Sequence, residues 1–178
     1  MKKFLLVIVL TVLFQPFISF SQTNWTVYEY SISFRIKNAG ITVNGKFTGL
    51  KTEILFSPEK LSSSRISGSV DAATLATGIN MRDKTIKEEK YLDAEKHKLI
   101  EATSTKLYTK DAYYAGLFNI TIKGVTKEVE IPFEFTPLGN LAEFKGEFKL
   151  NRRDFEVGGG SMTMADNLTV KILIKAKS

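Results

Sequence analysis

The chain of 178 residues contains no cysteine and only one histidine, His97. Without cysteine no disulfide can hold the fold, and the usual zinc ligand sets and the Cys-His pair of nucleophilic enzymes cannot be assembled within one chain. The remaining histidine lies between Lys96 and Lys98, so we expect it to be exposed and to have no catalytic role in a Ser-His-Asp arrangement. We therefore predict no metal, no cofactor and no enzymatic activity. Sites made only of carboxylates stay open, but solvated turns and helix caps explain the same residues more simply: Asp83, Asp93, Asp154 and Asp166.

The chain also lacks a run of basic residues. Its formal net charge is +6, and two of these charges, Lys2 and Lys3, lie at the extreme N-terminus. The other lysines and arginines are spread along the sequence, whereas a nucleic-acid-binding protein usually gathers them into a patch. We predict that the protein has no nucleic-acid partner.

Only one long hydrophobic run is present, at residues 4–14. It follows the two N-terminal lysines and precedes small residues at Ser19 and Ser21, the order that is typical of a cleaved signal peptide. The run is shorter than the roughly 20 residues that a membrane-spanning helix needs, which favours cleavage over an uncleaved anchor. We predict a signal peptide at residues 1–21 with cleavage near Ser21 and Gln22, and one mature domain at residues 22–178 in the periplasm or outside the cell. Since 178 − 21 = 157, the mature domain is long enough for a core of its own.

Alternating hydrophobicity is clearest at residues 114–135. Side chains of one face recur at every second position, first up to Ile122 and then from Val129 to Phe135, around a short segment that contains Gly124. This period of two predicts two antiparallel strands in a β-hairpin with one long apolar face.

Similar alternation recurs at residues 32–36, 65–72, 99–107, 142–150 and 168–176. The phase changes between Phe47 and Leu50, which predicts a break at Thr48 and Gly49. Helical signals are confined to a single turn at residues 58–61 and to residues 81–90 with Asn80 as cap. About eight strands with short connections predict a mainly β protein, and a closed antiparallel barrel is favoured over a sandwich because it removes exposed strand edges.

The predicted inward face mixes aromatic and very small residues. The large ones are Phe34, Phe47, Phe118, Phe133, Phe135, Phe144 and Phe148, and the small ones are Gly45, Gly68, Gly116, Gly146, Ala72, Ala102 and Ala142. The small residues leave room for a guest that the rings would line, but they also suit close backbone approach around a filled core. Composition alone leaves these two alternatives open.

Several short motifs together resemble the YceI-like family of exported lipid-binding proteins. They occur in the same order along nearly the whole mature chain: residues 80–83, 91–93, 116–129, 150–155 and 166–170. The resemblance implies a lipocalin-like antiparallel β-barrel with one or two short helices, whose apolar tunnel holds a polyisoprenoid or a related amphiphile. It favours the hollow interior.

The resemblance also implies where a ligand would lie. We predict that the apolar tail contacts Phe34, Phe47, Phe118, Ile120, Phe133, Phe135, Phe144 and Phe148. Arg82 or Arg152 suits a polar or phosphate head group near the mouth, although a structural ion pair with Asp83 or Asp154 is the slightly favoured explanation of either arginine.

The chain departs from the usual pattern of the family at several positions. A histidine is common where Thr85 stands, an aromatic-proline pair where His97 and Lys98 stand, a phenylalanine where Ala102 stands, and a glycine where Glu156 stands. The missing histidine removes one candidate contact to the head group. Ala102 widens the predicted tunnel. The resemblance therefore predicts the fold of this chain better than it predicts the identity of the ligand.

The leading hypothesis is therefore a carrier that binds or sequesters an isoprenoid or other long-chain amphiphilic lipid without catalysis. Such a carrier is compatible with peripheral or transient membrane contact and with a homodimer. The alternative is a ligand-free interaction or stress-response module that acts through its surface. An enzyme acting on a lipid or quinone-like substrate inside the barrel has the least support, because only carboxylates, tyrosines or Arg82 are available for catalysis.

Overall fold

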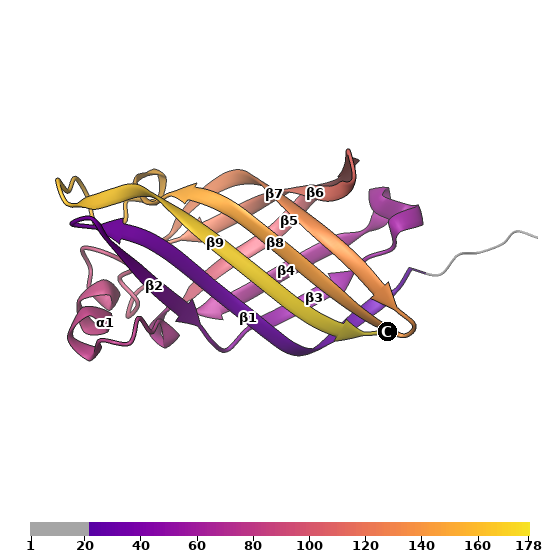
Figure 1. Ribbon diagram of the computed structural model, residues 1–178, viewed down its shortest axis with the longest axis horizontal. Coiled ribbons are helices and arrows are strands. Elements are labelled where there is room, and N and C mark those ends of the chain that lie inside the picture. The colour runs from indigo at the N-terminus through magenta and orange to yellow at the C-terminus, as the bar shows by residue number, and fades with distance from the viewer. Residues whose placement is uncertain (1–21) are drawn as a thin grey trace, which may run out of the picture.

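The computed structural model describes residues 22–178, so the predicted signal peptide lies outside the described residues. The described chain forms a closed barrel of eight antiparallel strands plus one additional strand (Figure 1). In chain order the strands are β1 (Asn24–Asn38), β2 (Ile41–Phe47), β3 (Lys51–Leu55), β4 (Arg65–Asp71), β5 (Leu99–Lys110), β6 (Tyr113–Ile122), β7 (Val125–Leu138), β8 (Leu141–Asn151) and β9 (Met164–Lys177). The predicted fold class is confirmed.

Strand β1 closes the barrel. Along one edge it pairs with β9 from Thr26 to Asn38, and along the other edge it pairs first with β3 and then with β2. The remaining strands pair as successive neighbours from β3 to β9. Because β1 has 15 residues, it is long enough to serve two partners in turn on the same edge. The extra strand β2 therefore covers only the half of β1 that follows Ile32.

The predicted break between Phe47 and Leu50 is present between β2 and β3. Gly49 has a positive φ of 74°, which a residue without a Cβ adopts at little cost. The hydroxyl of Tyr30 accepts hydrogen bonds from the main-chain N–H groups of Gly49 at 2.8 Å and Leu50 at 3.2 Å. This contact fixes the point at which the chain leaves one strand and enters the next.

The predicted hairpin at residues 114–135 is confirmed as β6 and β7. Tyr114 lies opposite Phe133, and Phe118 lies opposite Val129, so the apolar faces of both strands point to the same side of the sheet. The turn uses two residues with positive φ, Lys123 and Gly124. The period-two pattern thus placed this part of the barrel wall and its inward face correctly.

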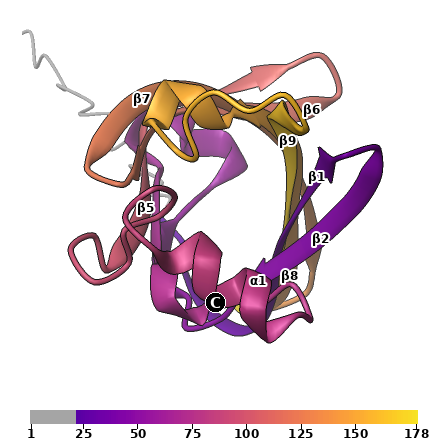
Figure 2. The ribbon, with the colours of Figure 1, turned by 90° about the vertical axis from the view of Figure 1, so that its left-hand side faces the viewer.

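Short helices and irregular segments lie at both ends of the barrel. One end carries the 3-10 helix η1 (Pro58–Ser63), and the other carries η2 (Ala72–Thr74), α1 (Asn80–Lys87) and η3 (Arg152–Phe155) (Figures 1 and 2). The prediction of a cap at Asn80 was wrong, because Asn80 is the first helical residue and the cap position is Ile79, whose side chain makes no capping bond. Among the described helices, none is long and apolar enough to cross a membrane.

Candidate functional site

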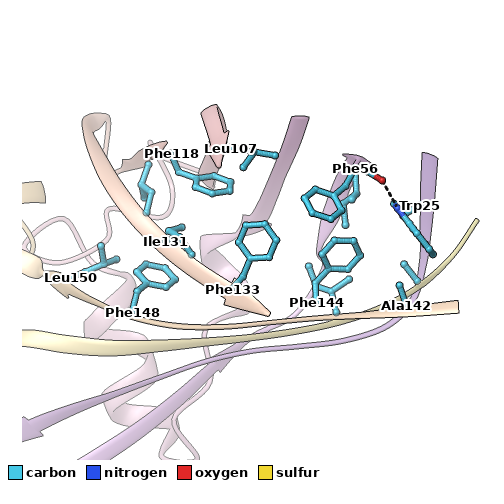
Figure 3. Packing of buried hydrophobic residues seen from close by; sticks show 14 of the residues in the cluster. Trp25, Phe56, Leu107, Phe118, Ile131, Phe133, Ala142, Phe144, Phe148 and Leu150 are labelled. Carbon is cyan, nitrogen blue, oxygen red and sulfur yellow. Dashed lines mark hydrogen bonds between the residues drawn. The ribbon is translucent and has the colours of Figure 1, made fainter. Parts of the chain in front are cut away.

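The barrel interior is solid at the end near η1. We call the six rings that fill it the aromatic plug: Trp25, Phe56, Tyr114, Phe133, Phe135 and Phe144. Phe56 is at its centre with 0% exposure, and its ring contacts the rings of Phe133, Phe135, Phe144 and Tyr114 at centroid distances of 4.9–5.7 Å. The indole Nε1–H of Trp25 donates to the carbonyl of Phe56 at 2.9 Å and fixes the outermost ring (Figure 3).

Beyond the plug the same interior is hollow. An apolar pocket of about 300 Å³ begins at Phe133 and Phe144 and continues along the barrel towards α1. Its wall is built by the inward side chains of the surrounding strands, including Phe118, Ile120 and Phe148. Phe118 and Phe148 point into the same interior space (Figure 3). Many inward apolar residues along the pocket are only partly buried: Ile32, Phe34, Ile36, Ile66, Ile100, Val170 and Ile172. These side chains retain accessible surface because they face a cavity instead of packed neighbours.

The surroundings of the inward glycines show where small residues belong to a filled core and where they border a cavity. A Cβ at Gly45 would lie 2.3 Å from the ring of Phe34, and one at Gly116 would lie 2.6 Å from both Leu107 and Phe118. At these two positions the missing side chain is replaced by a neighbouring ring or methyl group, as a filled core requires. At Gly68 the closest atoms would be at 3.6 Å, which is ordinary contact. Gly68 and its neighbour in register, Ala102, therefore leave volume in the pocket wall.

Irregular segments cover the pocket at the α1 end. Leu75, from the segment after η2, and Leu92, from the segment after α1, are buried and form a second small cluster with Ala72 and Ala94. Ile86 of α1 and Val157 pack against this cluster and also line the pocket. We call these residues the cap. It differs from the plug in that aliphatic side chains on short segments close this end, whereas interlocked aromatic rings close the other.

Eight of the ten predicted site residues line the pocket: Phe34, Phe47, Phe118, Ile120, Phe133, Phe144, Phe148 and Arg152. Phe135 lies in the plug, where its ring is 5.0 Å from that of Phe144 and 5.6 Å from that of Trp25. It shares the inward face of β7 with Phe133, but two residues further along the strand it lies beyond the closed end of the pocket. The tenth residue, Arg82, lies outside the pocket lining on α1.

Arg152 is buried at 4% exposure, and its guanidinium is fully bonded within the protein. It donates to the carbonyl oxygens of Ala165, Val157, Gly159 and Met164 at 2.6–3.3 Å. It also donates to the carboxylate of Asp166 at 2.8 Å, so its ion-pair partner is not the predicted Asp154. These bonds tie η3 and the loop at residues 156–163 to the start of β9. With its donors engaged in this way, Arg152 gives the predicted head-group contact no support.

Arg82 has a local structural role as well. Its Nε donates to the hydroxyl of Thr77 at 2.8 Å and its Nη2 donates to the Thr77 carbonyl at 2.9 Å. The carboxylate of Asp83 accepts from the Thr77 main-chain N–H at 2.8 Å and also from the Thr77 hydroxyl. These bonds, led by that from the Thr77 hydroxyl, hold the pKa of Asp83 below its ordinary value. Arg82 and Asp83 thus fasten the start of α1 to the preceding segment, and the predicted ion pair between them is not present.

The prediction of an exposed His97 was wrong. The exposed fraction of its side chain is 25%, because the imidazole ring packs over Gly124, where a Cβ would lie 2.7 Å from the ring. Asp93 is 3.9 Å from its Nε2. Within residues 22–178, no group of three or more histidine or acidic side chains is arranged to hold a metal ion.

Sequence reasoning missed the cap residues Leu75, Ile86, Leu92 and Val157. They lie in segments without a period of two, so no alternation marks their inward direction. It also missed Phe56, which follows β3 and carries the centre of the plug. The alternation placed Phe56 in phase with Leu50 and Ile54, but nothing in the sequence marked it as the centre of an aromatic cluster.

The comparisons with known proteins agree with this architecture. The model of the YceI-like domain matches residues 25–176, which is nearly all of the described chain. The chain belongs to the YceI-like family. Among the curated relatives of the chain, a UPF0312 protein of Vibrio campbellii is 30% identical over 135 residues, covering 71% of each chain. A UPF0312 protein of Serratia proteamaculans is 27% identical over 133 residues, covering 71% of this chain and 69% of the relative.

Solved structures share the YceI-like barrel. BcnA of Burkholderia cenocepacia matches with a TM-score of 0.82 at 21% identity, over 85% of this chain and 100% of BcnA. A polyisoprenoid binding domain from Saccharophagus degradans, implicated in plant cell wall breakdown, matches with a TM-score of 0.65 at 10% identity, over 89% of this chain and 99% of that domain. At these identities the likeness establishes a common fold.

Proposed function

We propose that the mature chain binds an isoprenoid or similar long-chain amphiphilic lipid, with the tail in the pocket and without catalysis. The observation that carries this proposal is the apolar pocket of about 300 Å³ beside a solid plug in the same barrel. A core meant only for stability would be filled along its whole length, since interiors are close-packed and voids are destabilising. An apolar cavity of this size is typical of a ligand site.

The binding energy would come from burial of the tail. At about 25 cal/mol per Å² of apolar surface, a tail that buries on the order of 400 Å² gains about 10 kcal/mol. Loss of translational and rotational freedom opposes this by at least about 4 kcal/mol. The difference of about 6 kcal/mol corresponds to a dissociation constant of about 40 µM, and a longer buried tail binds more tightly.

Membership of the YceI-like family supports the lipid as ligand class, because one relative of the same fold is a polyisoprenoid binding domain. The absence of catalysis is part of the proposal. The pocket wall is almost wholly aliphatic and aromatic, and Arg152, the one buried charged side chain along it, donates its hydrogen bonds to main-chain carbonyls and Asp166. Tyr91, Glu101 and Lys145 also line the pocket, and we assign none of them a catalytic role.

Native mass spectrometry of protein purified gently from its own cell envelope tests the proposal. We expect an added mass that is released by organic solvent and identified as an amphiphile with an apolar tail. Protein that is folded, free of added mass, and unable to take up any prenyl alcohol would contradict the proposal. Such a result would favour the alternative, a module that acts through its surface.

We further propose that the protein is exported by cleavage after Ser21 and that it touches a bilayer transiently with its α1 end. Export is supported by the sequence of residues 1–21, and N-terminal sequencing of the mature protein tests it. The segment before α1, α1 itself, the start of β2 and the loop before β9 lie at this end of the barrel (Figure 2). Each carries an exposed apolar side chain, which supports membrane contact: Ile79, Met81, Ile41 and Met162. Lys84 and Lys87 on α1 add positive charge that suits anionic lipid.

Co-sedimentation with vesicles of anionic and neutral lipid tests the membrane contact. We expect Met81→Ser to weaken binding several-fold, because Met81 is 81% exposed beside the two lysines. Leu138→Ser is the matched control, because Leu138 is 74% exposed at the opposite end of the barrel. Equal loss in both variants, or no loss in Met81→Ser, would contradict contact through the α1 end.

A further inference from the structure

We infer that the aromatic plug acts as a stop that limits the bound tail to about four isoprenoid units. This inference rests on the proposed function and makes it more specific. It follows from three features: interlocked rings close the pocket at the plug, these rings are rigid, and the length of β8 between the plug and the α1 end sets the space available to the tail.

The closed end is formed by Phe133 and Phe144. These two rings belong both to the plug and to the pocket wall, whereas Trp25, Phe56 and Phe135 belong only to the plug. A tail that reaches Phe133 and Phe144 therefore meets their rings, with the ring of Phe56 directly behind at 5.7 Å and 5.6 Å. Further penetration would require moving a residue that is completely buried.

The plug is rigid because its rings hold one another. Phe56 makes edge-to-face contacts with Tyr114, Phe133 and Phe144, an arrangement that aromatic rings favour. Phe56 itself follows the end of β3, but the rings around it are carried by strands, and Phe133 and Phe144 lie on the paired strands β7 and β8. The bond from Trp25 to the Phe56 carbonyl fixes the outer layer. The cap at the other end has no comparable interlocking, so we place the mouth and the head group there.

The length available to the tail follows from β8. From Phe144 at the plug to Leu150 near η3 there are six residue steps, which span roughly 20 Å along the strand. Barrel strands tilt by about 35–45° from the axis, so the axial length is about 15 Å. An extended chain advances roughly 1.1–1.2 Å per covalent bond, as in a polypeptide, and an isoprenoid unit contributes four such bonds. A tail along the axis or along the wall therefore fits about three to four units.

A series of prenyl alcohols with two, three, four, six and eight units tests this inference with the mature chain. We expect the dissociation constant to fall more than about tenfold for each added unit up to four, because each unit buries several carbons. From four units to eight, we expect a change of less than about threefold, because the added units stay outside the pocket. A dissociation constant that keeps falling strongly at six and eight units would overturn the inference that the plug stops the tail. Failure of every alcohol to bind would instead overturn the proposed function.

Two matched variants locate the stop. Phe144→Ala removes a ring that faces the pocket. In this variant we expect the affinity for the six-unit alcohol to rise at least about tenfold relative to the affinity for the four-unit alcohol. Phe135→Ala removes a ring of the same size from the plug but behind Phe144, and we expect its limit to stay at four units. A folded Phe144→Ala protein with an unchanged limit, or the same shift in both variants, would overturn the inference. Should Phe144→Ala fail to fold, Phe144→Leu and Phe133→Leu give the same comparison with a smaller change.

Discussion

Filling the pocket from one side should weaken lipid binding without weakening the fold. Ala102 on β5 lies between Gly68 of β4 and Ile120 of β6 in register, and its side chain lines the pocket. Ala102→Leu adds three carbons to this space and displaces an equal part of the tail. At about 0.8 kcal/mol per carbon, the lost burial is about 2.4 kcal/mol, or about a 50-fold weaker dissociation constant.

The assay is a titration of the mature chain with a four-unit prenyl alcohol, together with urea unfolding. Thr103→Leu is the matched control, because Thr103 is the next residue on β5 and is exposed on the outer face. We expect the control to bind like the original chain and Ala102→Leu to keep its free energy of unfolding within about 1 kcal/mol, since its added carbons enter a void. Unchanged lipid binding in a folded Ala102→Leu protein would refute the assignment of the pocket.

Three further predictions concern the parts that frame the pocket. Phe56→Ala should lower the free energy of unfolding by about 3–5 kcal/mol in a urea titration, because it removes the fully buried centre of the plug; a loss below about 1 kcal/mol would contradict this role. Arg152→Met should destabilise the protein by about 2–4 kcal/mol, because four main-chain carbonyls lose this donor and Asp166 keeps only its ion pair with Arg153. It should also speed hydrogen exchange at residues 156–163; unchanged exchange there would count against it. The pKa of Asp83 lies below its ordinary value, so the stability that its carboxylate adds is complete above the ordinary pKa and is lost as the pH falls through the lowered pKa. Amide hydrogen exchange in α1 should therefore become faster at such acidic pH. Asp83→Asn should abolish this pH dependence.

The sequence was sufficient to predict the strands of the barrel wall, because a strand with one buried face has apolar residues at every second position. This pattern identifies both the strand and its inward face. The hairpin of β6 and β7 and the break at Gly49 were predicted on this basis alone. The same signal placed Phe118 and Phe148 on the inward face and brought them to the pocket. What it could not give was position along the barrel axis. Phe133 and Phe135 share one face and one strand, yet only Phe133 reaches the pocket.

The ends of the barrel were less predictable, because short irregular segments follow no period. Leu75 and Leu92 became cap residues through the path of the chain around α1, which tertiary contacts decide. The two arginines show a related limit. Their charge suggested a head-group contact, but the partners that determine their role, Thr77 for Arg82 and the carbonyls around Arg152, are main-chain and hydroxyl groups that a sequence does not mark.

A crystal structure of the mature chain with a four-unit prenyl alcohol tests the central claim most directly. We predict continuous density for the tail between the plug and the cap, with its end against Phe133 and Phe144 and its hydroxyl at the α1 end. Density for the alcohol only on the outer surface, or side chains that collapse to fill the pocket, would contradict the claim that this barrel encloses a lipid tail.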